Sequence, residues 1–422
     1  MSQESILSPL TEKLDNGVFR TVLPSGTVVL SEHMESIRSI TIGFWFRQGR
    51  VHEAETELGA SHLLEHMVFK GTARRSPREL AWAIERLGGT LDAYTTHEAT
   101  AYHARIPAEE LNVALDVLTD LTFYPLLRES DLRLEREVVL EEIAATEDVP
   151  AEVAFEKHAR FLYDGHPYGE PIIGTRESVT ALSAENLSAV HRKVYQPGNL
   201  VVAAAGNIEH VALVDSLQAL LPEGETPVSE KPVEVPTGSI GVRRVEQGGG
   251  RQIHIVTGGL STSYKDPLRY ALLVTSTALG EGMSSRLFQR IREELGLSYT
   301  VYSFHGFFSE IGHVGAYVAT RPESAAAAHN ALFSELATIA VDGITIEELE
   351  DTRTQLKGQI LISLESPGAR MNRLAGVALY DQPYRTLDEV ASRIDMVSLD
   401  QCKEAACYFD PTRLATLELA PE

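Results

Sequence analysis

Apolar residues in the first half of the chain follow two different spacings. Residues 19–33 form two apolar runs around a Pro-Ser-Gly turn, and residues 39–53 alternate apolar and polar positions. Alternation with a period of two predicts strands, whereas apolar residues that recur every three or four positions predict helices. On this basis we expect strands over 19–33, 39–53, 90–106 and 200–208, and helices over 59–70, 76–89, 107–123 and 128–148.

The same order of patterns returns in the second half of the chain. Residues 222–250 are rich in Pro, Gly and Glu, which is typical of a linker. Strand and helix patterns follow, including a predicted helix at 284–296, and the last strand lies roughly 215 residues after its counterpart at 200–206. We therefore predict an α+β fold with two homologous domains, each an antiparallel-type sheet packed with helices, facing each other across a cleft. The predicted boundaries are 15–221 for the first domain, 222–250 for the linker or hinge, and 251–422 for the second domain.

Composition and charge restrict the partners and the compartment. The 422 residues carry a formal net charge of -23, which argues against nucleic acid or an anionic membrane and favours cationic partners. The spacing of Cys402 and Cys407 fits no common zinc or redox motif. The N-terminus has no apolar segment of signal-peptide length, and no apolar run is long enough to span a membrane. These features predict a cytoplasmic protein.

The predicted helix at 59–70 contains a possible metal site. His62 and His66 stand four residues apart, so a helix places both imidazoles on one face, and Glu65 points close to the same side. A catalytic zinc takes three protein ligands and one water, so this pair needs a third ligand, an acid or another histidine, from elsewhere. The alternative is a pair of histidines that make core hydrogen bonds and bind no metal.

Two acids on the predicted helix at 128–148 could complete the site. Glu135 and Glu142 are seven residues apart and therefore lie on one helix face. A solvated acidic surface, paired with the nearby arginines, is the alternative. However, residues 138–140 and Ile143 are apolar, and an acid on a largely buried helix needs a partner. One carboxylate could bind the metal while the other holds a ligand imidazole.

Both segments are similar to a known family. The sequences HLLEHMVFKGT, residues 62–72, and EREVVLEEI, residues 135–143, resemble the inverted-motif zinc peptidases of the M16 family, which includes pitrilysin, insulin-degrading enzyme and the mitochondrial processing peptidase. The resemblance covers nearly the whole chain and identifies it as a short, bacterial-type member. It implies one zinc ion per chain, with His62, His66 and Glu142 as ligands, Glu65 as the general base and Glu135 as a supporting residue.

The resemblance also assigns residues that would contact the substrate. Residues 90–106 match the family strand whose edge pairs with substrate backbone, although this chain has Asp92-Ala93-Tyr94 where members commonly have Asn at the first position. An ionised Asp accepts hydrogen bonds but donates none, which could favour cationic peptides or weaken activity. In residues 280–303, Arg292 and Tyr299 match the family's Arg and Tyr, and the resemblance implies that they hold the substrate and stabilise the oxyanion.

The function implied is zinc-dependent endopeptidase activity. A metal-activated water would attack a peptide bound as an added edge strand beside residues 91–95, inside a closed chamber. Because one chain supplies two domains, the chamber of the family would need two copies, and we expect a homodimer acting on peptides, possibly basic ones. Two alternatives stay open: a non-catalytic structural subunit, and a processing peptidase with a non-identical partner. The second would need a glycine-rich loop in the partner, and residues 246–252 of this chain resemble such a loop only weakly and fit the hinge better.

Overall fold

The computed structural model describes residues 10–223, 233–248 and 250–421, so residues 224–232 and 249 of the predicted linker lie outside the described residues. The chain divides into two compact units that interleave along the sequence. The first unit contains the described residues up to 143, residues 171–223 and residues 363–384. The second unit contains the remaining described residues. The predicted domains, 15–221 and 251–422, run without interruption, whereas these units exchange residues 144–170 and 363–384.

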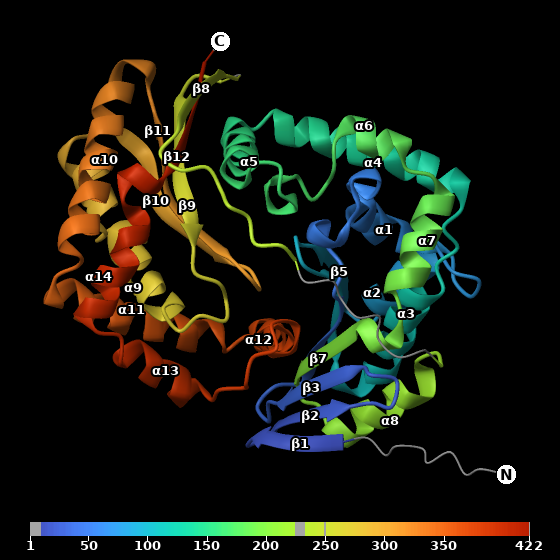
Figure 1. Ribbon diagram of the computed structural model, residues 1–422. Coiled ribbons are helices and arrows are strands. Elements are labelled where there is room, and N and C mark those ends of the chain that lie inside the picture. The colour runs from blue at the N-terminus through green and yellow to red at the C-terminus, as the bar shows by residue number, and fades with distance from the viewer. Residues whose placement is uncertain (1–9, 224–232, 249, 422) are drawn as a thin grey trace. The chain divides into compact units, whose positions relative to one another are not determined.

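The first unit is built on a sheet of seven strands in the order β1-β2-β3-β7-β4-β6-β5 (Figure 1). Neighbouring strands are antiparallel, except that β3 and β7 are parallel. The alternation in residues 39–46 places Phe44 in the main core of this unit and Trp45 on the opposite face of the sheet. The strands are β1 (Leu10–Asp15), β2 (Val18–Val22), β3 (Val28–His33), β4 (Ser39–Phe46), β5 (Thr90–Thr95), β6 (Thr100–Pro107) and β7 (Leu200–Gly206).

Helices cover both faces of this sheet. On one face, α1 and α3 pack their apolar residues against the sheet in the main core. On the other face, Met371 and Leu374 of α12 pack against strand residues such as Leu30 and Val201. The helices of this unit are α1 (Ala60–Val68), α2 (Pro77–Glu85), α3 (Leu111–Phe123), most of α4 (Glu129–Glu147), α6 (Arg176–Ala181), α7 (Ala184–Val194), α8 (His210–Leu220) and α12 (Pro367–Leu379).

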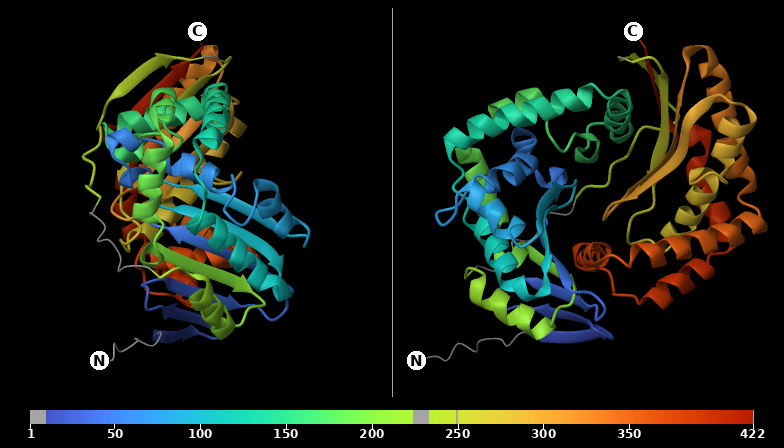
Figure 2. Two further views of the ribbon diagram at one scale, coloured as in Figure 1. Left: turned by 90° about the vertical axis from the view of Figure 1, so that its right-hand side faces the viewer. Right: turned by 180° about the vertical axis from the view of Figure 1, so that it is seen from behind.

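The second unit repeats this plan with a sheet of five strands in the order β10-β11-β9-β12-β8, in which only β12 and β8 are parallel among the described strands. Figure 2 shows its strands beside the long orange helix α10. The strands are β8 (Arg243–Gln247), β9 (Ile253–Ser261), β10 (Ser298–Phe307), β11 (Gly312–Thr320) and β12 (Ala415–Ala420). The helices are α5 (Pro150–Tyr163), α9 (Arg269–Gly280), α10 (Ala325–Asp342), α11 (Ile346–Ser363), α13 (Leu387–Asp395) and α14 (Leu399–Ala406).

Two helix-covered sheets in one chain confirm the predicted fold class. The helix predicted at 284–296 is present, and its residues Phe288–Glu294 form a π-helix, η6. The amide of Leu295 bonds the carbonyl of Arg290, five residues back, at 3.2 Å. The spacing of apolar residues does not distinguish an α-helix from a π-helix over a segment this short, in which Ile291 is the buried residue. In the described part of the chain, no helix is both long enough and apolar enough to span a bilayer.

Helix α5 belongs to the second unit because its inner face packs on that sheet. Ala154 lies in a cluster with Val256 and Leu419, and His158 Nε2 donates a hydrogen bond to the Ala415 carbonyl at 3.0 Å. His158 also contacts the edge of the Phe304 ring, and it is almost fully buried. Burial lowers the pKa of His158 to about 4, although the bond to the Ala415 carbonyl opposes this shift.

We expect His158 to make the second unit sensitive to acid. The unfolded chain takes up a proton at this histidine below about pH 6.5, whereas the folded protein does so only below about pH 4. Stability is therefore lost as the pH falls from 6.5 to 4, by about 2 kcal/mol at pH 5. His158→Gln keeps an N–H donor without the titration, and urea unfolding at pH 7 and pH 5 should show a smaller acid loss. Equal losses in both proteins would contradict this assignment.

Candidate metal centre

The start of α1 is fixed by a buried carboxylate. Glu53 accepts hydrogen bonds from the backbone N–H groups of Gly59, at 3.0 Å, and Ser61, at 2.7 Å. These amides belong to the first turn of α1 and have no partner within the helix. Burial raises the pKa of Glu53, and the two backbone bonds oppose that shift. Gly59 has φ +88°, and a Cβ there would approach the Ile173 carbonyl to 2.8 Å, so a side chain at this position is excluded.

Helix α1 divides its residues between the core and a polar face. Leu63, Leu64 and Met67 are fully buried in the core of the first unit. His62 and His66 lie on the other side, one turn apart, with their ring centroids separated by 4.8 Å. The apolar residues anchor the helix, so the two imidazoles are held on a rigid element.

Helix α4 brings two carboxylates to the same place. Its buried stripe contains Leu132, Glu135, Val139 and Ile143. Val138, which is also apolar, is half exposed and does not belong to this stripe. Glu142 lies two turns after Glu135, and its side chain is 46% exposed. One acid of this helix is therefore enclosed by protein, and the other faces partly open space.

Three side chains offer ligand atoms to one point. One atom from each of His62, His66 and Glu142 lies within 4.8 Å of the others. His62 Nε2 is 3.7 Å from Glu142 Oε1, and His66 Nε2 is 3.6 Å from Glu142 Oε2. Two ligand atoms bound to a tetrahedral zinc at about 2.1 Å lie roughly 3.4 Å apart, so these residues fit such an ion. The open side at Glu142 leaves room for a fourth ligand.

The two histidines have different surroundings. Burial, followed by the neighbouring His66, lowers the pKa of His62 to about 4, so its imidazole is neutral at pH 7, as metal binding requires. Its Nδ1 is buried and has no hydrogen-bond partner among the described residues. His66 Nδ1, by contrast, donates to Glu135 Oε2 at 3.2 Å, which directs Nε2 toward Glu142. His66 is therefore the better oriented ligand.

Glu65 projects beside the two histidines and is partly buried. Burial raises the pKa of its carboxyl, and the Glu142 charge adds to the shift, whereas the Thr95 hydroxyl and His66 oppose it. Its Oε2 accepts a hydrogen bond from Thr95 Oγ1 at 2.5 Å. A carboxylate in this position can accept a proton from a water held by the three ligands.

Strand β5 lies next to α1 and ends the strand order of its sheet. Among the described strands, only β6 pairs with it, so its outer edge can accept another strand. Asp92 and Tyr94 point to the exposed face, and Ala93 packs against the core on the other face. Trp45 Nε1 donates to the Tyr94 hydroxyl at 3.0 Å, which fixes the tyrosine ring.

Arg292 and Tyr299 lie together in the second unit. Arg292 donates to the backbone carbonyl of Tyr299 at 3.1 Å, and its guanidinium stacks over the rings of Tyr299 and Phe288. The Tyr299 side chain is among the most exposed large side chains of the chain, at 78%. The structure thus places Arg292 of η6 beside Tyr299 of β10, and their roles in catalysis stay predictions.

Two polar residues of this site were not predicted from the sequence. Lys70 Nζ lies 2.5 Å from Glu135 Oε1, and Thr95 binds Glu65. Lys70 follows His66 by four residues, so the spacing that linked His62 with His66 could have pointed to it. Thr95 shares a strand face with Leu91 and Ala93, so the period of two could have placed it on the side of α1.

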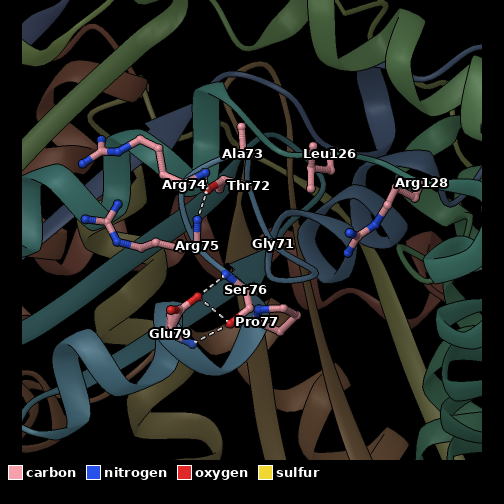
Figure 3. A pocket seen from close by; sticks show the side chains of 10 residues that line it. All are labelled: Gly71, Thr72, Ala73, Arg74, Arg75, Ser76, Pro77, Glu79, Leu126 and Arg128. Atoms are coloured by element: carbon pink, nitrogen blue, oxygen red, sulfur yellow. Dashed lines mark hydrogen bonds between the residues drawn. The ribbon is translucent and has the colours of Figure 1, made fainter.

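A cavity of about 300 Å³ lies at the turn between α1 and α2, lined by three arginines among others. The guanidinium groups do not converge, since Arg74 and Arg75 extend to one side of the turn and Arg128 to the other (Figure 3). Asp116 and Asp120 pair with Arg74 and Arg75. Arg128 pairs with Asp131, so all three arginine charges are balanced by carboxylates of the protein, and the cavity shows no cluster of converging cations.

Comparisons with known proteins agree along nearly the whole chain. Residues 28–176 match the model of insulinase, peptidase family M16, and residues 181–356 match that of the peptidase M16 inactive domain. A protein of Streptomyces coelicolor named an uncharacterized zinc protease is 36% identical over 398 residues, 92% of this chain and 86% of that protein. YmxG of Bacillus subtilis, with the same description, is 35% identical over 388 residues, 90% of this chain and 93% of that protein.

Solved structures show the same fold at lower identity. A protease from Helicobacter pylori has a TM-score of 0.87 at 22% identity and covers 98% of this chain and 100% of its own. A peptidase M16 inactive domain from Pseudomonas fluorescens has a TM-score of 0.89 at 21% identity and covers 96% of this chain and 98% of its own. Taken with the family models and the relatives at about 35% identity, these matches show that the chain belongs to the M16 (insulinase) peptidase family.

Proposed function

We propose that this chain is a zinc-dependent endopeptidase that hydrolyses peptides or short unfolded polypeptides. One observation carries the proposal: His62, His66 and Glu142 converge on one point. Glu65 projects beside them from α1, the helix that carries the two histidines. The relatives named zinc proteases support it. A structural subunit without activity would not need this donor set, so we place that alternative second.

The proposed reaction divides the work among residues of the first unit. His62, His66 and Glu142 would hold the metal, and Glu135 would keep the His66 ring in its orientation. When bound, Zn²⁺ would lower the pKa of a water to about 7 and would polarise a carbonyl. Glu65 would accept the proton of the attacking water and pass it to the leaving amine. The outer edge of β5 would bind substrate backbone as an added strand, which favours extended peptides of varied sequence.

The experiment that tests this proposal is mass spectrometry of a peptide library. The purified full chain should produce internal cleavages, lose them when a chelator removes the metal, and regain them when Zn²⁺ is added back. A chain that contains about one zinc and cleaves no peptide would contradict the proposal and favour the structural subunit. Cleavage that survives complete metal removal would also contradict it.

We further propose that Asp92 gives the site a preference for basic peptides. Asp92 is exposed on the outward face of β5, and Tyr94 lies two residues on along the same face. His103 is the cross-strand neighbour of Asp92, but burial lowers the pKa of His103, so it is neutral at pH 7 and leaves the Asp92 charge uncompensated. A Lys or Arg side chain of an added strand could pair with Asp92 and stack on Tyr94.

Asp92→Asn should reduce this preference. An exposed ion pair is worth up to about 1 kcal/mol, so kcat/KM for a peptide with one Lys or Arg should fall about two- to fivefold, relative to its neutral counterpart. The wild-type preference should weaken at high salt, and that of the variant should not. Rates that respond to neither salt nor the substitution would contradict a charge contact at this position.

The remaining assignments rest on the family resemblance. We propose that Arg292 and Tyr299 complete the site by holding the substrate and stabilising the oxyanion. A homodimer in the cytoplasm is the form we propose for the active protein, and its mass in solution tests the dimer. An active species found only with a second, different chain would favour the processing-peptidase alternative.

A further inference from the structure

We propose that Thr95 is a positioning residue that holds Glu65 in place for proton transfer. This inference rests on the proposed peptidase function and adds a residue to its machinery. Thr95 Oγ1 donates to Glu65 Oε2 at 2.5 Å, and within the described part of the chain this is the only hydrogen bond of the Glu65 side chain. One carboxylate oxygen is thus anchored, and Oε1 is left to accept a proton.

Glu65 needs such an anchor because its other neighbours do not orient it. A glutamate side chain has three rotatable bonds, so the position of its carboxylate on a helix is not set by the backbone. Among the described residues it has no other hydrogen bond, and the Glu142 carboxylate, which shares the site, repels it. Without the Thr95 bond, no hydrogen bond would fix the side-chain rotamer, and the carboxylate would leave the position from which it can accept a proton.

Thr95 sits on a rigid part of the fold. It is the last residue of β5 and pairs with Thr100 of β6, and the Thr96 amide closes the hairpin by bonding the Ala99 carbonyl at 2.8 Å. Thr100 in turn donates to the Gln48 carbonyl at 2.8 Å from a fully buried position. The branched side chain of threonine also restricts its own rotamer in a strand. The hydroxyl is therefore presented at a fixed point.

The same strand serves two purposes in this arrangement. Its outer backbone edge is the proposed binding place of the substrate, while the Thr95 side chain on the α1 side holds the base. The scissile bond and the base are thus positioned from one short element. An error of about 1 Å in such a geometry can reduce a rate about a hundredfold.

Two substitutions at position 95 distinguish the effect of the hydroxyl group from the effect of the side-chain shape. Thr95→Val keeps the branched shape and should lower kcat about ten- to a hundredfold with little change in KM, because substrate binding is untouched. Thr95→Ser keeps the hydroxyl and should recover most of the rate. Thr180→Val removes an exposed threonine hydroxyl of the same unit, on α6 and outside the proposed site, so it is the control and should match the wild type.

Readouts other than activity keep this test separate from the test of the peptidase function. Crystal structures should show the Glu65 carboxylate displaced in Thr95→Val and retained in Thr95→Ser, with equal zinc content and equal thermal unfolding midpoints. An undisplaced Glu65 in Thr95→Val would overturn the proposal, as would equal loss of kcat in the Val and Ser variants. If the wild type hydrolyses no peptide, the peptidase proposal fails, and the position of Glu65 in the two structures still decides the role of Thr95.

Discussion

Glu65→Gln is expected to bind zinc as well as the wild-type protein does and to lose about 10²- to 10⁴-fold in kcat. The amide has the size of the carboxylate and can still accept the hydrogen bond of Thr95 through its oxygen. It cannot take up a proton, so the step proposed for Glu65 has no acceptor. The ligands His62, His66 and Glu142 are unchanged, and metal binding should therefore be retained.

The measurement combines peptide turnover with zinc content per chain. Glu141→Gln is the matched control, because Glu141 is an exposed acid on α4 beside the site and has no place in the proposed mechanism. This control should keep both turnover and zinc. A Glu65→Gln enzyme with normal turnover would refute the base assignment, and a variant that loses zinc in parallel with turnover would point to a role of Glu65 in holding the site together.

The sequence predicted local structure around the candidate metal centre well, for a physical reason. The spacing of Leu63, Leu64 and Met67 fixes the buried side of α1, and this alone places His62 and His66 together on the other side. Such reasoning uses only neighbours within one helix. The identity of the third ligand came from family resemblance, since no spacing rule relates α1 to a helix about 70 residues later.

Contacts between side chains of different helices and strands could not be predicted from the sequence. Lys70 meets Glu135, and Thr95 meets Glu65, only because of how α4 and β5 are placed against α1. The periodicity tells which face of each element is buried, but the identity of the facing residue depends on the register between elements. The contacts of the Thr95 hydroxyl with Glu65 and of the Lys70 ammonium with Glu135 therefore required the three-dimensional structure.

The exchange of helices between the units has a similar explanation. Met371, Leu374, Ala375 and Ala378 give α12 a buried face, and Ala154 and His158 do so for α5. An amphipathic pattern predicts that a helix packs on something, and it does not name the sheet. The sequence therefore favoured two uninterrupted domains, whereas α12 packs on the sheet of the first unit and α5 on that of the second.

His66→Ala is expected to lose zinc almost completely and, with it, all metal-dependent hydrolysis. The substitution removes one of three protein ligands, and it also removes the ring that the buried Glu135 holds. Among the described residues, Glu135 would then keep only Lys70 as its partner. The site would contain three acids, Glu65, Glu135 and Glu142, around fewer nitrogen ligands. Elemental analysis after dialysis, with competition against a chromophoric chelator, measures the loss.

A graded series makes this prediction sharper than a single variant. Glu135→Gln keeps all three proposed ligands and disturbs only the orientation of His66. Its zinc affinity should therefore fall about 10- to 100-fold, as is usual when a residue that hydrogen-bonds a metal ligand is replaced. His66→Ala should exceed that loss, and His33→Ala, a half-buried histidine of the same unit whose ring bonds the Ile208 carbonyl, should show none. If Glu135→Gln and His66→Ala lost zinc equally, the metal would depend on the order of the whole cluster, and His66 would not be a direct ligand. The predicted order, with His66 most severe, follows only if its Nε2 binds the ion itself.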